Sequence, residues 1–312
     1  MKPSRCVAAV VSTALLAFGA CERGPETARN DFDGALADSL VDRQVAFGPR
    51  VPGTEAHDQA LAWLVEYLRA RADTVETMPF THVTTFGDTL RLSNVFARFR
   101  PDAVQRVLLV AHWDSRPVAE QARDAASRRE PVPGANDGAS GVAVLLAIAD
   151  RFGQLPSVVG VDILLTDGED WGHDPQTLST VPEDMFLGAR HFASTHRDYR
   201  PLFGILLDLV GDENPVFPWE GHSLRNAPEV VTRVWDVAEE LGYGDVFVPR
   251  AGPPIGDDHV ALNEVGIRTI DIIDFDYPYW HTPEDTPDKV SAETLDIVGE
   301  VVIAVLQRQG GR

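Results

Sequence analysis

The stretch RVLLVAHWDS, residues 106–115, joins an apolar run to a group of polar side chains. The run from Arg106 to Ala111 is rich in Val and Leu, which is typical of a buried strand. His112 and Asp114 follow directly where this strand should end. The stretch VDILLTDGED, residues 161–170, is built in the same way. Two buried strands that end in polar side chains predict a functional site at one edge of a sheet.

The periodicity of the remaining chain predicts helices that alternate with strands. Helical patterns cover residues 35–46, 57–71, 140–152, 184–195, 228–241 and 292–307, and apolar runs typical of strands cover 90–98, 106–111, 161–166, 203–209 and 269–273. This alternation predicts a single globular α/β domain, with a central, mostly parallel mixed sheet and helices on both faces. In such sheets, ligands bind at the carboxyl ends of the strands.

The charge of the chain limits its partners. Its 312 residues include 48 Asp and Glu against 27 Lys and Arg, which gives a formal net charge of -21. Such an excess of negative charge repels phosphate backbones, so we expect no nucleic acid partner.

The first 30 residues have the pattern of an export signal. A basic start is followed by a short apolar run and then by small residues before Cys21, so residues 1–20 are predicted to be a signal peptide. The end of this segment resembles the lipobox of bacterial lipoproteins, which predicts a lipid anchor at Cys21 on a periplasmic or extracellular membrane face. An ordinary cleaved secretory signal is the alternative. Residues 21–30 are predicted to be a tether, and residues 31–312 the folded domain, which has no cysteine and therefore no internal disulfide.

Several metal-binding residue types are predicted to converge at one edge of the sheet. Glu169 and Asp170 follow the second strand, and Asp208 lies at the end of the strand predicted over 203–209. Asp137 lies in GANDGASG, residues 134–141, just before a predicted helix, and His281 lies in DIIDFDYPYWHTPEDT, residues 271–286. Each has an ordinary alternative when taken alone, such as a helix cap for Asp137 or a solvated loop acid. Their placement at the same edge favours a metal site.

Zinc is the metal that best fits these residue types. Zinc takes imidazole and carboxylate ligands in a tetrahedral array, and a catalytic zinc keeps one position open. Asp137, Asp170 and His281 would supply three ligands and leave the fourth position free. One of the neighbouring acids Glu169 and Asp170 can then bind the metal while the other transfers a proton, and the spacing alone leaves open which does which.

The motifs, taken in their order, resemble those of a known family. HWDS, GANDGASG, DGED, GARHFA, LLDLVGDENPVFP, GDDH and YWHTPED are similar to motifs of the zinc aminopeptidase family (metallopeptidase family 28), and most closely to its glutaminyl cyclase branch. The resemblance covers residues 41–306. It implies that Asp137, Asp170 and His281 are zinc ligands, Glu169 the proton-transferring acid, Asp208 and Asp257 acids that orient Glu169, and Trp280 the aromatic wall of the substrate pocket.

The resemblance implies an enzyme that acts on peptide or protein N-termini. A glutaminyl cyclase uses one zinc ion and converts an N-terminal glutamine to pyroglutamate with release of ammonia. The alternative is an aminopeptidase with two zinc ions, in which His112 and Asp208 would bind the second ion. A third hypothesis, an inactive surface-anchored binding protein, is less favoured because no ligand and no catalytic acid is missing.

The sequence also leads to three expectations about the pocket. Asp170 stands where many relatives have the longer Glu, so its loop must lie closer to the zinc. Tyr277 and Tyr279 are candidates to line the pocket beside Trp280, with packing beneath the loop as the alternative. Residues 116–133 form a long excursion that either covers the pocket or lies on the surface.

Overall fold

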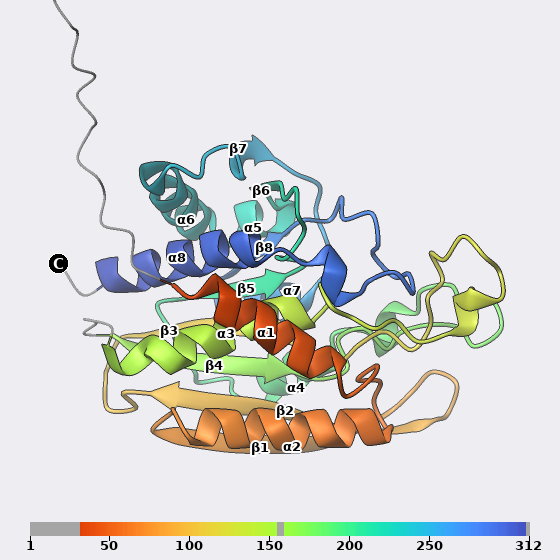
Figure 1. Cartoon of the computed structure of the whole chain (residues 1–312). Helices are drawn as coiled ribbons and strands as arrows, with labels where there is room; N and C mark the ends of the chain where they lie inside the picture. Colours follow the sequence, from red (N-terminus) through yellow and green to blue (C-terminus); the bar gives the residue numbers. More distant parts are fainter. Residues whose placement is uncertain (1–31, 155–158, 310–312) are drawn as a thin grey trace, which may run out of the picture.

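A computed structural model describes residues 32–154 and 159–309 as one α/β domain around a six-stranded sheet (Figure 1). The predicted signal peptide, Cys21 and the tether lie outside the described residues. The strands of this sheet are β1 (Thr74–Val83), β2 (Thr89–Phe99), β3 (Arg106–His112), β4 (Gly160–Thr166), β5 (Phe203–Asp208) and β8 (Thr269–Ile273), in the order β1-β2-β4-β3-β5-β8. Strands β4, β3, β5 and β8 are parallel to one another, whereas β1 and β2 pair antiparallel at one edge.

Helices cover both faces of the sheet, as the sequence predicts. The helices are α1 (Gly34–Val45), α2 (Glu55–Arg69), α3 (Ala139–Arg151), α4 (Leu187–Thr195), α5 (Gly221–Asn226), α6 (Pro228–Leu241), α7 (Asp258–Glu264) and α8 (Ala292–Arg308). Helices α1, α3 and α8 pack together on one face, and α4 and α7 pack on the other (Figure 1). Every residue of β3, β4, β5 and β8 is buried, because both faces of these strands are covered.

The two faces of the strands contribute to two apolar cores. In β3, Val107, Leu109 and Ala111 point into the larger core, which the helices α1, α3 and α8 complete. Leu108 and Val110 point the opposite way, into a smaller core shared with α4. This alternation determines which strand residues point to which face of the sheet. Residues that follow the strand ends need not enter either core and can be polar.

The close approach of α3 to the sheet depends on one glycine. A Cβ atom at Gly141 would lie 2.1 Å from the carbonyl oxygen of Leu207 in β5. Any other residue would force the helix away from the strand. This contact holds the N-terminal end of α3, and the GANDG turn before it, against the carboxyl ends of the central strands.

The predicted fold class is confirmed, and the elements differ in detail. The helix predicted over 184–195 begins at Leu187, because residues 182–184 form a separate 3-10 turn and Phe186 has a left-handed backbone with φ 59°. The strand predicted over 203–209 ends at Asp208, because Leu209 also turns to a positive φ of 51°. The periodicity did not predict β1, the helices α5 and α7, or the small parallel sheet of β6 (Phe217–Trp219) and β7 (Phe247–Ala251).

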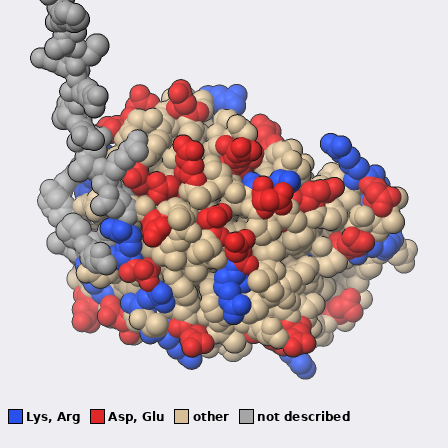
Figure 2. Space-filling view, viewed as in Figure 1, with Lys and Arg blue, Asp and Glu red and all other residues tan. Residues whose placement is uncertain are grey.

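The described surface is rich in acidic side chains. Figure 2 shows Asp and Glu spread over the face seen in Figure 1, with Lys and Arg between them. In residues 32–154 and 159–309, no helix is both long and apolar enough to cross a membrane.

Candidate active site

Asp137, Asp170 and His281 come together at the carboxyl ends of the parallel strands. One donor atom from each residue lies within 4.8 Å of the others. Nε2 of His281 lies 3.3 Å from Oδ1 of Asp170 and 3.6 Å from Oδ2 of Asp137. The three residues come from the turn before α3, the loop after β4 and the loop after β8. The predicted convergence of these distant segments is therefore found in the structure.

This group has the features expected of a metal site. All three residues are buried, and Oδ2 of Asp137 and Oδ2 of Asp170 have no hydrogen-bond partner among the described residues. Buried carboxylate oxygens rarely go unpaired, because removing them from water is costly. Two carboxylates and one imidazole suit zinc, with a fourth position left for a ligand.

A second group of donors adjoins the first and shares Asp137 with it. Donor atoms of His112, Asp137 and Asp208 also lie within 4.8 Å of one another. Nε2 of His112 lies 3.2 Å from Oδ1 of Asp137 and 3.1 Å from Oδ1 of Asp208. Asp208 is 8% exposed, which excludes the alternative that it is an ordinary acid exposed to solvent. The side chain of Asp137 does not cap α3 either, because that helix has Gly138 as its N-cap without a side-chain hydrogen bond.

Glu169 lies beside both groups but belongs to neither. Among the described residues, it is absent from every cluster of donors close enough to share an ion. Burial, and then the charge of Asp170, raise the pKa of Glu169 well above its usual value. A carboxyl group with a raised pKa keeps a proton that an ordinary glutamate would have lost, and an acid that both gives and takes a proton needs such a shift.

The pKa values of other acids are also shifted in the site, where several buried carboxylates lie close together. Burial, and then the charge of Asp170, raise the pKa of Asp137 to about 7. Burial, and then the charge of Asp208, raise the pKa of Asp257 well above its usual value. Burial alone would also raise the pKa of Asp170, but the charges of His281 and Arg116 outweigh it and lower that pKa to about 2. A divalent cation among these carboxylates would offset their mutual repulsion.

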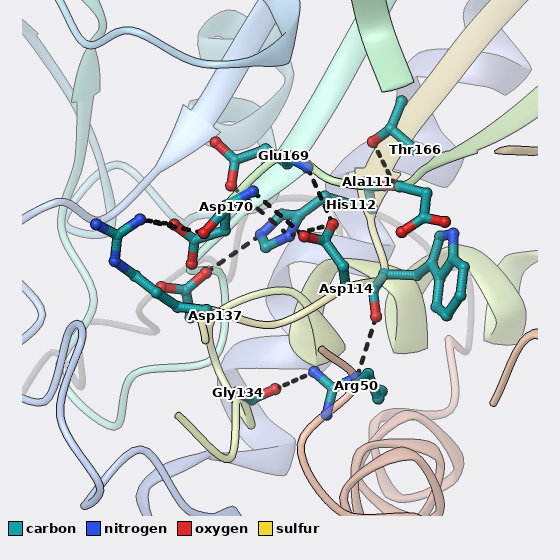
Figure 3. Close-up of polar contacts among 12 residues, drawn as sticks. Arg50, Ala111, His112, Asp114, Gly134, Asp137, Thr166, Glu169 and Asp170 are labelled. Carbon is teal, nitrogen blue, oxygen red and sulfur yellow. Dashed lines mark hydrogen bonds and ion pairs between the residues drawn. The ribbon is translucent and has the colours of Figure 1, made fainter. Parts of the chain in front are cut away.

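Two acids that were not among the predicted site residues bind the backbone of the site. Asp114 accepts hydrogen bonds from the backbone nitrogens of Glu169 at 3.1 Å and Asp170 at 3.3 Å (Figure 3). Asp285 accepts from the backbone nitrogens of Asn136 at 2.8 Å and Asp137 at 3.1 Å. Both acids lie in quoted motifs, HWDS and HTPED, but only the three-dimensional structure shows that they bind the backbone of the metal-type residues.

A pocket of about 420 Å³ opens directly onto this group. Glu169, Asp257 and Trp280 line it, together with apolar residues that include Ile255 and Phe275. The Trp280 ring stacks on the imidazole of His281 with 3.8 Å between centroids. This volume suits a ligand the size of one or two amino-acid residues.

Of the two alternatives for Tyr277, the structure shows packing beneath the loop and not pocket lining. Tyr277 is 3% exposed, and its hydroxyl donates to Oδ1 of Asp285 at 2.8 Å. Its ring packs against Tyr279, which also lies outside the pocket lining. Tyr277 therefore packs beneath the loop, with the half-buried Tyr279 against it. The hydroxyl of Tyr277 supports the carboxylate that orients the Asp137 backbone.

The backbone of His281 is itself unusual. Its φ of 54° lies in the left-handed region, which a residue other than glycine adopts at a cost of about 1–3 kcal/mol. Such strain is commonly found at functional sites, where the surrounding structure maintains it. The motif YWHTPED gives no sign of it, because the sequence pattern does not report backbone angles.

A mostly parallel sheet that carries metal-binding residue types at its strand ends, with a further buried acid beside them, defines a metal-dependent α/β enzyme. The chain belongs to peptidase family M28, because the model of that family matches residues 94–306. The predicted family is thereby confirmed.

The similar proteins include one named as an exopeptidase and others named as glutaminyl cyclases or cyclotransferases. The chain is similar to the solved structure of a Zn-dependent exopeptidase from Parabacteroides distasonis, with 38% identity, a TM-score of 0.86, and coverage of 91% of this chain and 100% of the other. It is also similar to the glutaminyl cyclase of Bacteroides thetaiotaomicron bound to N-acetylhistamine, with 38% identity, a TM-score of 0.85, and coverage of 88% and 98%. A glutaminyl-peptide cyclotransferase-like protein of Mus musculus is 27% identical over 293 residues, which cover 82% of this chain and 71% of the mouse protein.

Proposed function

We propose that this protein is a zinc-dependent glutaminyl-peptide cyclotransferase. It would convert the N-terminal glutamine of peptides or proteins to pyroglutamate and release ammonia. The observation that carries this proposal is the position of Glu169, a buried acid that lines the pocket beside a three-donor group without belonging to it. The similarity to proteins named as glutaminyl cyclases supports the same activity.

Asp137, Asp170 and His281 would hold one zinc ion. Their unpaired buried oxygens and their mixture of carboxylate and imidazole donors support this assignment. When bound, zinc would polarise the side-chain carbonyl group of the glutamine and make its carbon more electrophilic.

Glu169 would carry the proton that the reaction must move. The α-amine nitrogen of the substrate bonds to its own side-chain carbonyl carbon, and the bond from that carbon to the amide nitrogen breaks. Glu169 would accept a proton from the attacking amine and give one to the departing nitrogen, which leaves as ammonia. Because it returns the proton, Glu169 ends the reaction in the state in which it began.

The pocket would contribute mainly by holding the substrate in a bent shape. Both reacting groups belong to one residue, so the entropy cost of bringing them together is small once the bent conformer is bound. Trp280 offers a flat apolar wall for this purpose, and Asp208 and Asp257 would orient Glu169. The charge of Asp257 also contributes to the raised pKa of Glu169.

An aminopeptidase with two zinc ions is the second candidate. The second donor group, His112, Asp137 and Asp208, supports this alternative because it could hold another ion at the shared carboxylate. The binding protein without activity finds no support in the site, since every predicted ligand and Glu169 are in place.

Zinc content and product analysis distinguish these functions. The purified protein should contain one zinc ion per chain, release ammonia from peptides that begin with glutamine, and leave peptides that begin with leucine intact. Two zinc ions with cleavage of the leucine peptide would select the aminopeptidase instead. Bound zinc with neither activity would contradict both enzyme assignments.

We also propose that the protein is an exported lipoprotein with a lipid anchor at Cys21. The basic start, the apolar run and the small residues before Cys21 support this assignment. In bacteria fed a labelled fatty acid, the wild-type protein should become labelled, and Cys21→Ser should not. Cys6→Ser is the matched control and should remain labelled, because Cys6 lies within the segment that is removed. Equal labelling of wild type and Cys21→Ser would contradict the anchor.

A further inference from the structure

The excursion over residues 116–133 contains an arginine whose burial needs an explanation. The Arg116 side chain has no exposed surface although it lies in a loop. Burial of a guanidinium is costly unless its N–H groups find acceptors. In Arg116, Nε and Nη1 find acceptors, whereas Nη2 has none among the described residues. Nη1 of Arg116 donates to Oδ1 of Asp170 at 2.8 Å and to the backbone oxygen of Asp170 at 3.1 Å. Arg116 therefore fixes both the side chain and the backbone of a proposed zinc ligand.

Glu120, four residues later, connects this arginine to a second proposed ligand. Its Oε2 accepts from Nε of Arg116 at 2.8 Å, and its Oε1 lies 2.5 Å from Nδ1 of His281. The backbone nitrogen of Gln121 also donates to the backbone oxygen of His281 at 3.2 Å. One short segment thus contacts two proposed ligands that come from other loops.

The contact with Glu120 determines how His281 can bind a metal. A carboxylate at Nδ1 keeps the proton on that nitrogen and leaves the lone pair of Nε2 free for the metal. In this structure Nε2 is the atom that lies 3.3 Å and 3.6 Å from the carboxylates of Asp170 and Asp137. The same carboxylate restricts rotation of the ring, so Nε2 keeps its direction.

Asp170 has a particular need for such support. Because its side chain is shorter than that of Glu, small movements of its loop would take its oxygens out of reach of a metal. The hydrogen bond from Arg116 to the backbone oxygen of Asp170 opposes such movement, and the bond to Oδ1 orients the carboxylate. Oδ2 of Asp170 has no partner among the described residues and is left for the metal.

We propose that Arg116 and Glu120 form a clamp that positions Asp170 and His281 and thereby sets the zinc affinity of the site. They are positioning residues, since they act through the two ligands. The proposal rests on the proposed zinc site. It gives the start of the 116–133 excursion a role, and it requires no change in the chemistry assigned to Glu169.

The test is the zinc affinity of Glu120→Gln. The amide of glutamine offers one acceptor atom, so it cannot accept from both His281 and Arg116 as the carboxylate does. Loss of a hydrogen-bond partner of a metal ligand typically weakens metal binding by about 10- to 100-fold. We expect an increase of that size in the zinc dissociation constant, measured by competition with a chromogenic chelator at fixed pH and salt. Arg116→Lys should weaken binding as well, because one ammonium group cannot reproduce the fork of the guanidinium.

Glu130→Gln is the matched control. Glu130 lies in the same excursion, is exposed, and loses the same charge in this substitution, so its zinc affinity should equal that of wild type. The thermal midpoint of the metal-free proteins provides the second readout. A lower midpoint for metal-free Glu120→Gln with unchanged zinc affinity would overturn the clamp and leave only a structural role.

The result separates the clamp from the proposed function. If the wild-type protein binds no zinc, the proposed function itself fails. If wild type binds zinc and Glu120→Gln and Arg116→Lys bind it equally well, only the clamp is overturned. At zinc concentrations that saturate Glu120→Gln, ammonia release should return to within a fewfold of wild type, because the catalytic acid is untouched.

Discussion

Glu169→Gln should retain its zinc and lose nearly all of its ammonia-releasing activity. General acid and base catalysis contributes about 100- to 10,000-fold to the rate of an enzyme, and glutamine cannot carry the proton. Zinc should remain because Glu169 lies outside the three-donor group of Asp137, Asp170 and His281. The measurement is zinc per chain by elemental analysis, together with the rate of ammonia release at saturating peptide.

A matched substitution tests whether the effect belongs to this acid. Glu183 is exposed and lies in the loop between β4 and α4, so Glu183→Gln should keep both zinc and full activity. Metal loss in Glu169→Gln would show that Glu169 and Asp170 have exchanged roles. Full activity with retained zinc would remove Glu169 from the mechanism.

The parts of the fold that periodicity predicts are those whose side chains enter a core. Strands such as β3 and β4 are buried on both faces, so their sequences are continuous apolar runs that could be recognised directly. Strand β1 was missed because it lies at the edge of the sheet, is mostly exposed, and contains Pro79. It becomes a strand through ten paired positions with β2, which its own sequence does not display.

The residues of the candidate site also fall into those that the sequence could predict and those that it could not. Asp137, Asp170, Glu169 and His281 could be selected because they are metal-binding residue types near the predicted ends of strands or the start of a helix, and because their motifs resemble those of a zinc-dependent family. Asp114 and Asp285 could not be assigned a role, because the backbone nitrogens that they bind are far away along the chain. The separation is at least 55 positions for Asp114 and at least 148 positions for Asp285. Hydrogen bonds between such distant residues produce no periodic pattern in the sequence. Every acidic residue near a motif is therefore an equally good candidate for them.

The position of Tyr277 shows a related limit of sequence patterns. An aromatic residue four positions before His281 is near the metal along the chain, but its direction depends on the path of the loop. In the structure that path turns Tyr277 inward, where its hydroxyl donates to Asp285. The same path brings Trp280 to the pocket, so neighbouring aromatic residues of one motif have different functions.

His281→Ala should abolish stable zinc binding and, with it, the contribution of zinc to stability. A metal that binds only the folded state stabilises it by about 4 kcal/mol when its concentration is 1,000 times the dissociation constant. Wild type should therefore unfold at a higher denaturant concentration in zinc buffer than in chelator. The alanine variant should unfold at the same concentration in both, because two carboxylates alone do not complete the site.

The comparison of zinc with chelator isolates the metal from other effects of the substitution. Removing the imidazole also leaves Oε1 of Glu120 without its partner and removes the stacking contact with Trp280. The chelated variant is therefore expected to be somewhat less stable than chelated wild type. That loss is the same in both buffers, whereas the zinc-dependent difference belongs to the metal alone. His173→Ala, at a half-buried histidine in the loop after β4, should keep the full zinc-dependent difference. If His281→Ala also kept it, zinc would bind away from His281, and the assignment of Asp137, Asp170 and His281 as the zinc ligands would be wrong. The second group, His112, Asp137 and Asp208, would then be the first site to test by substitution.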